Sequence, residues 1–141
     1  MTPRRATLAD AATLARLNAH VQAWHAAHYP EAFFPAPDPK ALAGYFSERL
    51  SDPGCTAFLS GDPATGYALC QLQTRETSLF SPGYRRLMID HIAVAPEARR
   101  QGQGGALLAV ARQLVRDLHA DEILLDTWEA NTDAHAFFRA N

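Results

Sequence analysis

Apolar positions recur every three or four residues near the start of the chain, which is the period of an amphipathic helix. Asp10 stands directly before this pattern and is a residue type that caps helices. We therefore predict a long helix from Ala11 to about His28. Its inner face carries Leu14, Leu17 and Val21.

Further along, the pattern changes to short apolar runs bounded by turn residues, which is typical of strands. A second helix near 39–50 precedes them, because Asp38 and Pro39 form a helix start after a loop rich in proline and aromatic residues. The rest of the pattern predicts a short edge strand at 2–7, strands at 56–60, 66–74 and 84–94, a helix at 105–118, a strand at 122–128 and a helix at 131–140.

This order puts antiparallel strands first and a strand–helix–strand unit near the end. The unit from Tyr84 to Trp128 should be a right-handed parallel crossover. The predicted fold class is therefore α/β (α+β), with a mixed, mostly antiparallel sheet flanked by helices. A length of 141 residues predicts one domain over 1–141.

Composition narrows the function classes. The chain is 48% apolar and 20% charged, as in ordinary globular proteins, and a net charge of −2 argues against a nucleic-acid-binding surface. The first ten residues lack the apolar core of a signal peptide, and no apolar run reaches the roughly 20 residues of a membrane span. We expect a cytoplasmic protein without membrane partners, in which Cys55 and Cys70 are free, buried thiols.

Three glycines crowd into four positions, Gly102, Gly104 and Gly105, between a predicted strand and a predicted helix. A P-loop is disfavoured because no lysine followed by serine or threonine comes next. A dinucleotide fingerprint is disfavoured because Leu107 stands at the third glycine position. Two readings remain open: a helix N-terminus whose backbone N–H groups bind a diphosphate, and a tight turn that packs helix on sheet.

Residues Arg99 to Gly104 fit the pattern [RQ]-x-x-G-x-[GA], and residues 131–138 fit N-x-x-A-x-x-[FL]-[YF]. Together with a Val-x-Pro turn at Val94, they resemble the GNAT superfamily of N-acetyltransferases. The resemblance implies transfer of acetyl from acetyl-CoA to an amine by direct attack in a ternary complex, without a metal. The alternative is a coenzyme A-binding protein with weak or no transferase activity, such as a sensor.

The resemblance also implies which residues bind acetyl-CoA. Strand positions 92–94 would pair with the pantetheine arm, backbone amides from Gln101 to Ala106 would hold the diphosphate, and the final helix would contact the pantetheine region. The implied cofactor-binding residues are Ile92, Ala93, Val94, Arg99, Arg100, Gln101, Gly102, Gln103, Gly104, Gly105, Ala106, Asn131 and Phe138. Asn131 is an equally good N-cap for the last helix, and both roles are compatible.

An amine acceptor must lose a proton before attack, and Asp90 and His91 are the candidate general bases. Neighbours on a regular strand point to opposite faces, so we expect only one of them to face the site. Many relatives carry a tyrosine that protonates the departing thiolate where this chain has Phe138. Tyr84, His135 or water would then substitute.

The loop after the first helix forms the acceptor wall in this family, which makes His28, Tyr29 and Glu31 the candidate substrate-binding residues. A metal site is disfavoured there because Pro30 breaks the helix that would hold the ligands. We expect the acceptor to be a small-molecule or peptide amine. The family continues with two further strands that this sequence does not contain, so the sequence is truncated or another chain supplies them. We expect a homodimer that covers the open edge of strand 122–128.

Overall fold

A five-stranded sheet forms the centre of the structure, a computed structural model that describes residues 2–126 and 131–141. Its strands lie in the order β1-β2-β3-β4-β5, and every neighbouring pair is antiparallel except β4 and β5, which are parallel. This confirms the predicted mixed, mostly antiparallel sheet. The strands are β1 (Arg4–Arg5), β2 (Cys55–Ser60), β3 (Gly66–Arg75), β4 (Tyr84–Val94) and β5 (Glu122–Leu125).

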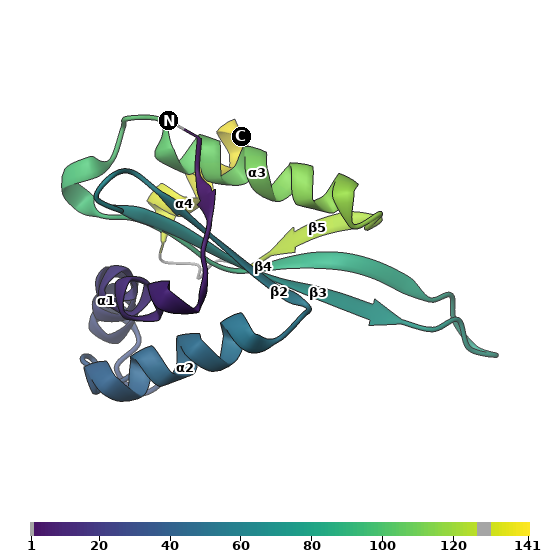
Figure 1. The fold of residues 1–141 in the computed structure, drawn as a ribbon, viewed down its shortest axis with the longest axis horizontal. Coiled ribbons are helices and arrows are strands. Elements are labelled where there is room, and N and C mark those ends of the chain that lie inside the picture. The colour runs from purple at the N-terminus through teal and green to yellow at the C-terminus, as the bar shows by residue number, and fades with distance from the viewer. Residues whose placement is uncertain (1, 127–130) are drawn as a thin grey trace.

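Helices cover both faces of the sheet (Figure 1). α1 (Ala11–His28) and α2 (Pro39–Ser51) lie on one face, and α3 (Gln103–Asp117) and α4 (Thr132–Ala140) lie on the other. Single 3-10 turns precede α1 at Leu8–Asp10 and follow β4 at Pro96–Ala98. None of the helices in the described part of the chain is long and apolar enough to cross a membrane.

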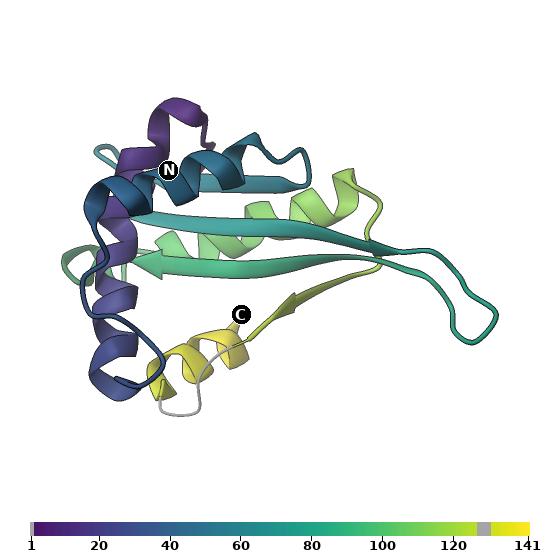
Figure 2. The same ribbon diagram turned by 90° about the horizontal axis from the view of Figure 1, so that it is seen from below.

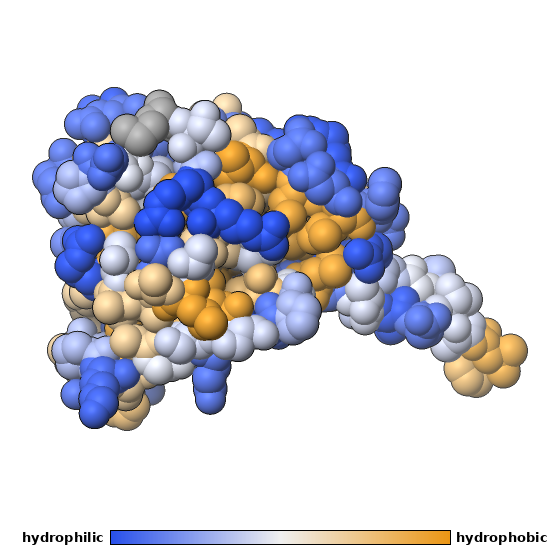
Figure 3. Space-filling view, viewed as in Figure 1, coloured by the Kyte–Doolittle hydropathy of each residue, from blue (hydrophilic) through white to orange (hydrophobic). Residues whose placement is uncertain are grey.

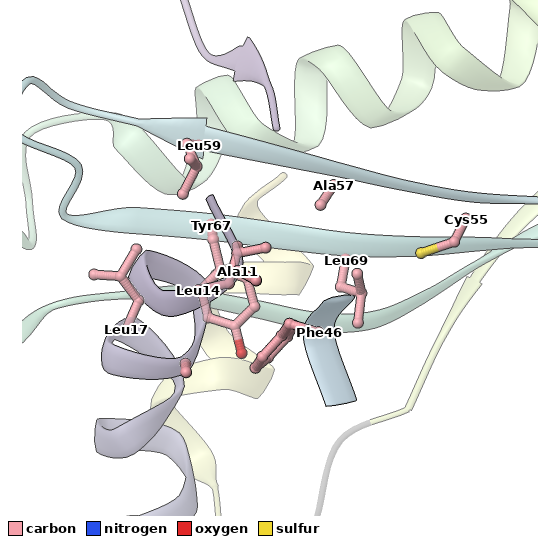
Figure 4. Close-up of a cluster of buried hydrophobic side chains, with 10 residues drawn as sticks. Ala11, Leu14, Leu17, Phe46, Cys55, Ala57, Leu59, Tyr67 and Leu69 are labelled. Carbon is pink, nitrogen blue, oxygen red and sulfur yellow. The ribbon is translucent and has the colours of Figure 1, made fainter. Parts of the chain in front are cut away.

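Two apolar clusters hold these layers together. The first joins α1 and α2 to the sheet, with Leu14, Phe46 and Tyr67 fully buried at its centre (Figure 4). The second joins α3 and α4 to the opposite face, around Leu87 and Leu108. Each cysteine belongs to one of the clusters and both are buried free thiols, as predicted: Cys55 and Cys70.

The start of α2 shows why the sequence predicts helix boundaries well where capping residues are present. Asp38 accepts a hydrogen bond from the backbone N–H of Ala41 at 2.9 Å, and Pro39 occupies the first turn, where its missing N–H costs nothing. The predicted boundary of this helix is therefore correct to within one residue.

The sheet loses its regularity in the middle of β4. Leu69 of β3 lies opposite His91 and Cys70 lies opposite Ile89, so Asp90 is an extra residue that forms a β-bulge. The ladder between β4 and β5 runs only from Arg86 to Ile89, so it ends directly before the bulge. Figure 2 shows the two strands diverging from there, with α4 following β5.

Most predicted boundaries agree with the structure to within one residue, and the larger differences are at β1, α3 and β5. β1 spans only Arg4–Arg5 instead of 2–7. α3 begins at Gln103, two residues before the predicted start, because Gly102 adopts a left-handed conformation with φ of 82° and serves as its N-cap. β5 ends at Leu125 instead of Trp128, and the last two residues of the predicted strand lie outside the described residues.

The hairpin that joins β3 to β4 projects from the body as an arm (Figures 1 and 3). Its turn is ordered by the Ser78 hydroxyl, which accepts hydrogen bonds from the backbone N–H groups of Phe80 and Ser81. Leu79 and Phe80 at the tip are more than nine-tenths exposed, so the arm ends in an apolar knob.

Candidate functional site

The bulge turns both candidate bases toward the same face of the sheet. The Asp90 carboxylate reaches Arg49 of α2, and the His91 ring contacts the rings of Tyr45 and Phe46 on the same helix. The prediction that only one of the two faces the site is therefore wrong. A regular strand alternates its side chains, whereas the extra residue of a bulge breaks the alternation.

Asp90 forms an ion pair with Arg49, in which Nη2 and Oδ2 lie 2.6 Å apart. Arg49 is held by two further acceptors, the Tyr45 hydroxyl at 2.8 Å and the Gln71 side-chain oxygen at 3.2 Å. The Arg49 and Asp90 side chains are 20% and 30% exposed, so the pair lies at the surface of the layer between α2 and the sheet. Asp90 is thus an oriented carboxylate whose other oxygen, Oδ1, accepts no hydrogen bond from the described residues.

His91 lies deeper than Asp90. Its Nδ1 is 3.1 Å from the Tyr67 hydroxyl, and the rings of Tyr45, Phe46 and Tyr67 surround it at centroid distances of 5.9–6.3 Å. Burial lowers the pKa of His91 to about 4, and the nearby Asp90 charge only partly offsets this. His91 is therefore a neutral imidazole near neutral pH.

The sequence reading missed Arg49, Tyr45 and Tyr67. Tyr45 and Arg49 are four residues apart on a predicted helix, which places them on one face. That spacing was visible in the sequence, but the face that they share is set by packing against a strand about 40 residues away.

Past the bulge, β4 has one paired edge and one open edge. Val94, Ala93 and Ile92 pair with Gly66, Tyr67 and Ala68 of β3, and no strand in the described part of the chain pairs with them on the β5 side. The three residues expected to pair with a pantetheine arm therefore lie on an open strand edge. At its end the Arg99 side chain folds back, and its Nε donates to the Val94 carbonyl at 3.1 Å.

The loop after β4 ends at the N-terminus of α3. Within residues 2–126 and 131–141, the backbone N–H groups from Gln101 to Gly105 have no acceptor, as expected for the first turn of a helix. Ala106 differs, because its N–H donates to the Gly102 carbonyl at 3.0 Å. Ala106 was predicted as the last of the diphosphate-binding amides, and it differs from the others in that its N–H already closes the first turn of the helix.

The three glycines of the loop have three different environments. Gly102 has φ of 82°, a conformation that favours glycine. A Cβ at Gly104 would lie 2.9 Å from the Phe137 ring of α4, so this glycine allows close packing of two helices. A Cβ at Gly105 would meet only the Asn141 side chain at 3.5 Å, an ordinary contact. Gly102 thus serves the turn, Gly104 serves the packing of α3 against α4 instead of against the sheet, and Gly105 has room for a side chain.

The side chains of the loop divide into inward and outward groups. Gln103 points inward: its oxygen accepts from the Ser60 hydroxyl at 2.7 Å, and its nitrogen donates to the Thr65 hydroxyl at 2.8 Å. These bonds tie the start of α3 to the β2–β3 turn and leave the Gln103 backbone N–H available. Arg99 and Arg100 are exposed, and Arg100 adopts a positive φ of 64°.

α4 begins at Asn131, whose side chain accepts from the Ala134 N–H at 3.1 Å and confirms the predicted N-cap. Phe138 packs with Phe137 against the second apolar cluster. Tyr84, a suggested substitute for the missing tyrosine, lies at the opposite end of β4 from Asp90, about 20 Å away along the strand. There the Arg75 and Arg86 guanidinium groups lie over its ring, at 4.7 and 4.1 Å from the centroid, so Tyr84 is not beside Asp90.

The candidate acceptor residues belong to an aromatic segment at the end of α1. His28 stacks on the Trp24 ring at 4.0 Å and its Nδ1 lies 2.9 Å from the Trp24 carbonyl. Tyr29 ends the helix, and Glu31 is exposed in the following turn. The adjacent His25 lies close enough to His91 to lower the pKa of that residue, which places the end of α1 near the bulge.

A comparison of the chain with protein-family models agrees with this geometry. Residues 18–141 match the model of the acetyltransferase (GNAT) family. No curated protein matches the sequence.

Solved structures share the fold. A tetramutant of the BH1408 protein from Bacillus halodurans superposes with a TM-score of 0.89 at 20% identity, over 99% of this chain and 91% of that one. A ribosomal-protein-alanine N-acetyltransferase from Brucella melitensis biovar Abortus 2308 has a TM-score of 0.67 at 18% identity, over 98% and 88%. The aminoglycoside N-acetyltransferase AAC(6')-Iy, in complex with CoA, has a TM-score of 0.74 at 18% identity, over 99% and 84%.

Proposed function

The chain belongs to the acetyltransferase (GNAT) family, and from this premise we propose that it is an N-acetyltransferase that transfers acetyl from acetyl-CoA to an amine. One observation carries the proposal. An open strand edge leads from the Asp90 carboxylate along β4 to a helix N-terminus with unused N–H groups. About fifteen residues of the chain thus contain, in order, the Asp90 carboxylate, the open strand edge at Ile92–Val94 and the N–H groups that could bind an anion.

Acetyl-CoA fits these residues. The open edge at Ile92–Val94 offers backbone groups to the amides of a pantetheine arm, as an added strand does. The N–H groups from Gln101 to Gly105 and the positive end of the α3 dipole suit a diphosphate. Arg99 and Arg100 add positive charge beside them, and Asn131 and Phe138 of α4 stand as further contacts. When bound, acetyl-CoA supplies an acetyl group activated as a thioester.

Asp90 is the general base in this proposal. Its Oδ2 is held by Arg49, while Oδ1 is left to accept the amine proton directly or through one water. Arg49 orients the carboxylate, because its Nη2 donates to Oδ2 at 2.6 Å. The acceptor amine then enters between the bulge and the end of α1, where we place His28, Tyr29 and Glu31 as acceptor contacts.

The test is acetyl-CoA-dependent thiol release with a panel of small and peptide amines, beside a thermal shift with acetyl-CoA. We expect both turnover and a shift. Asp90→Asn should lower kcat by about 10²–10⁴-fold while the thermal shift persists. Asp117→Asn, at the far end of α3, is the matched control and should leave kcat unchanged. A shift without turnover on any amine would favour the coenzyme A-binding protein instead.

The substrate contacts and the partner are tested separately. Glu31→Gln should raise the KM for the acceptor, and an unchanged KM removes Glu31 from the acceptor site.

We also propose a homodimer, because the described residues place no strand on the outer edge of β5, and such edges pair readily with another chain. A monomer mass in light scattering would refute it.

A further inference from the structure

A chain of buried polar groups runs from α1 through β3 to the bulge. The Asn18 side-chain amide donates to the Tyr67 hydroxyl at 3.0 Å, and that hydroxyl lies 3.1 Å from Nδ1 of His91. Asn18 is 6% exposed and Tyr67 is fully buried in the first apolar cluster, beside Phe46 (Figure 4). A hydrogen-bonded chain inside an apolar cluster has only its own members as partners, so the direction of each bond is constrained.

With the Asn18 amide as the donor, the hydrogen count sets the direction of the second bond. The Tyr67 oxygen accepts from Asn18, and its single hydrogen is left to donate. Nδ1 of His91 is the acceptor within reach. If Nδ1 carried the proton instead, the Tyr67 hydrogen would be buried without an acceptor in this cluster. A neutral His91 that accepts at Nδ1 carries its proton on Nε2.

The groups around His91 favour the same protonation state. Aromatic rings from β3 and α2 pack against the imidazole: Tyr67, Tyr45 and Phe46. Of the charged and titratable groups, Asp90 on β4 favours the cation, whereas Arg49 on α2 and His25 on α1 disfavour it. Burial outweighs the Asp90 charge and, together with Arg49 and His25, keeps the ring neutral.

We propose that Tyr67, held by Asn18, is a positioning residue that fixes His91 as a neutral hydrogen-bond donor at Nε2, beside the Asp90 carboxylate. This assignment rests on the proposed function and gives Asp90 and His91 different roles in it. Asp90 Oδ1 takes the proton of the amine, because the only basic nitrogen of His91 is already occupied by Tyr67. His91 instead keeps its proton on Nε2, where the ring is a hydrogen-bond donor.

Nitrogen-15 NMR of the histidine rings tests the assignment on the protein alone, without acetyl-CoA or amine. We expect the wild-type His91 signals near neutral pH to report the Nε2-protonated tautomer. Tyr67→Phe keeps the ring but removes the hydroxyl, so the preference for this tautomer should fall by about threefold to tenfold. Tyr45→Phe removes a hydroxyl that contacts Arg49 and not His91, and should leave the His91 tautomer unchanged.

Several outcomes overturn the proposal. A wild-type His91 ring that is protonated at Nδ1, or charged near neutral pH, refutes the proposal. The wild-type spectrum therefore tests the proposal even if Tyr67→Phe fails to fold. A tautomer ratio that is the same in wild type and Tyr67→Phe also refutes the role of Tyr67. A protein that shows the expected tautomer but transfers no acetyl group refutes the proposed function alone. With an active enzyme, Tyr67→Phe should also move the pH profile of kcat/KM, which a merely structural role would not.

Discussion

Alanine substitutions at Gly104 and Gly105 should differ in their effects on stability, although the residues are neighbours in the first turn of α3. Replacing glycine by alanine within a helix stabilises it by about 0.8–1 kcal/mol. At Gly105 nothing opposes this gain, because the new Cβ would lie 3.5 Å from the Asn141 side chain. We therefore expect Gly105→Ala to raise the free energy of unfolding by about 1 kcal/mol.

At Gly104 the same methyl group meets the Phe137 ring, with Cζ at 2.9 Å and Cε1 at 3.0 Å. These contacts are too short to persist, so the ring or the whole of α4 must move. Overpacking of this kind costs about 1–3 kcal/mol, which equals or exceeds the helix-propensity gain. The free energy of unfolding of Gly104→Ala should therefore be about 1–3 kcal/mol lower than that of Gly105→Ala.

Urea denaturation of the two variants measures this difference, and each serves as the control for the other. A third protein isolates the cause: in a Phe137→Ala background, Gly104→Ala should stabilise as Gly105→Ala does, since the clashing ring is gone. Equal free energies for the two single variants would show that Phe137 does not pack on Gly104. The position of α4 against the N-terminus of α3 would then be wrong.

Four further changes test other parts of the structure. Arg100→Gly should raise the free energy of unfolding by up to about 1 kcal/mol in urea denaturation, because it relieves a left-handed backbone at a residue with a side chain. Asn131→Ala should lower it by about 1 kcal/mol through loss of the cap on α4. The Arg4 hydrogen bond holds the pKa of Asp10 at about 2, so stability should fall between about pH 4 and pH 2, and Asp10→Asn should remove that loss in acid titration. His91 has its pKa lowered by burial from 6.5 to about 4, so the unfolded chain binds the proton first and stability should decline as pH falls through that range; His91→Gln should flatten this slope in thermal melts.

The sequence predicted most of the fold because its signals are local. Asp38 and Pro39 mark the start of α2 within a few residues, and the glycines of 102–105 mark the turn into α3. The element order followed from these signals, and the mixed sheet followed from the order. The start of α3 was misplaced because a left-handed N-cap at Gly102 is a backbone conformation, which the residue type permits but does not dictate.

The arrangement of the site was less predictable because it depends on pairing between distant segments. The bulge at Asp90 exists only relative to β3, about twenty residues earlier, and nothing within the segment 84–94 marks which residue is extra. The Arg49–Asp90 ion pair joins residues 41 positions apart. The Gly104–Phe137 contact likewise joins two helices that the sequence treats as separate elements.

One irregularity in the sheet accounts for both halves of the site. The extra residue in β4 ends the pairing with β5, which opens the strand edge at Ile92–Val94. The same residue breaks the alternation of side chains, which turns Asp90 and His91 toward α2 together. A regular strand would close the edge and send one of the two side chains to the opposite face, against α3. The open edge and the paired acid and imidazole are therefore consequences of one backbone feature, and a change that restored the regular register would remove both at once.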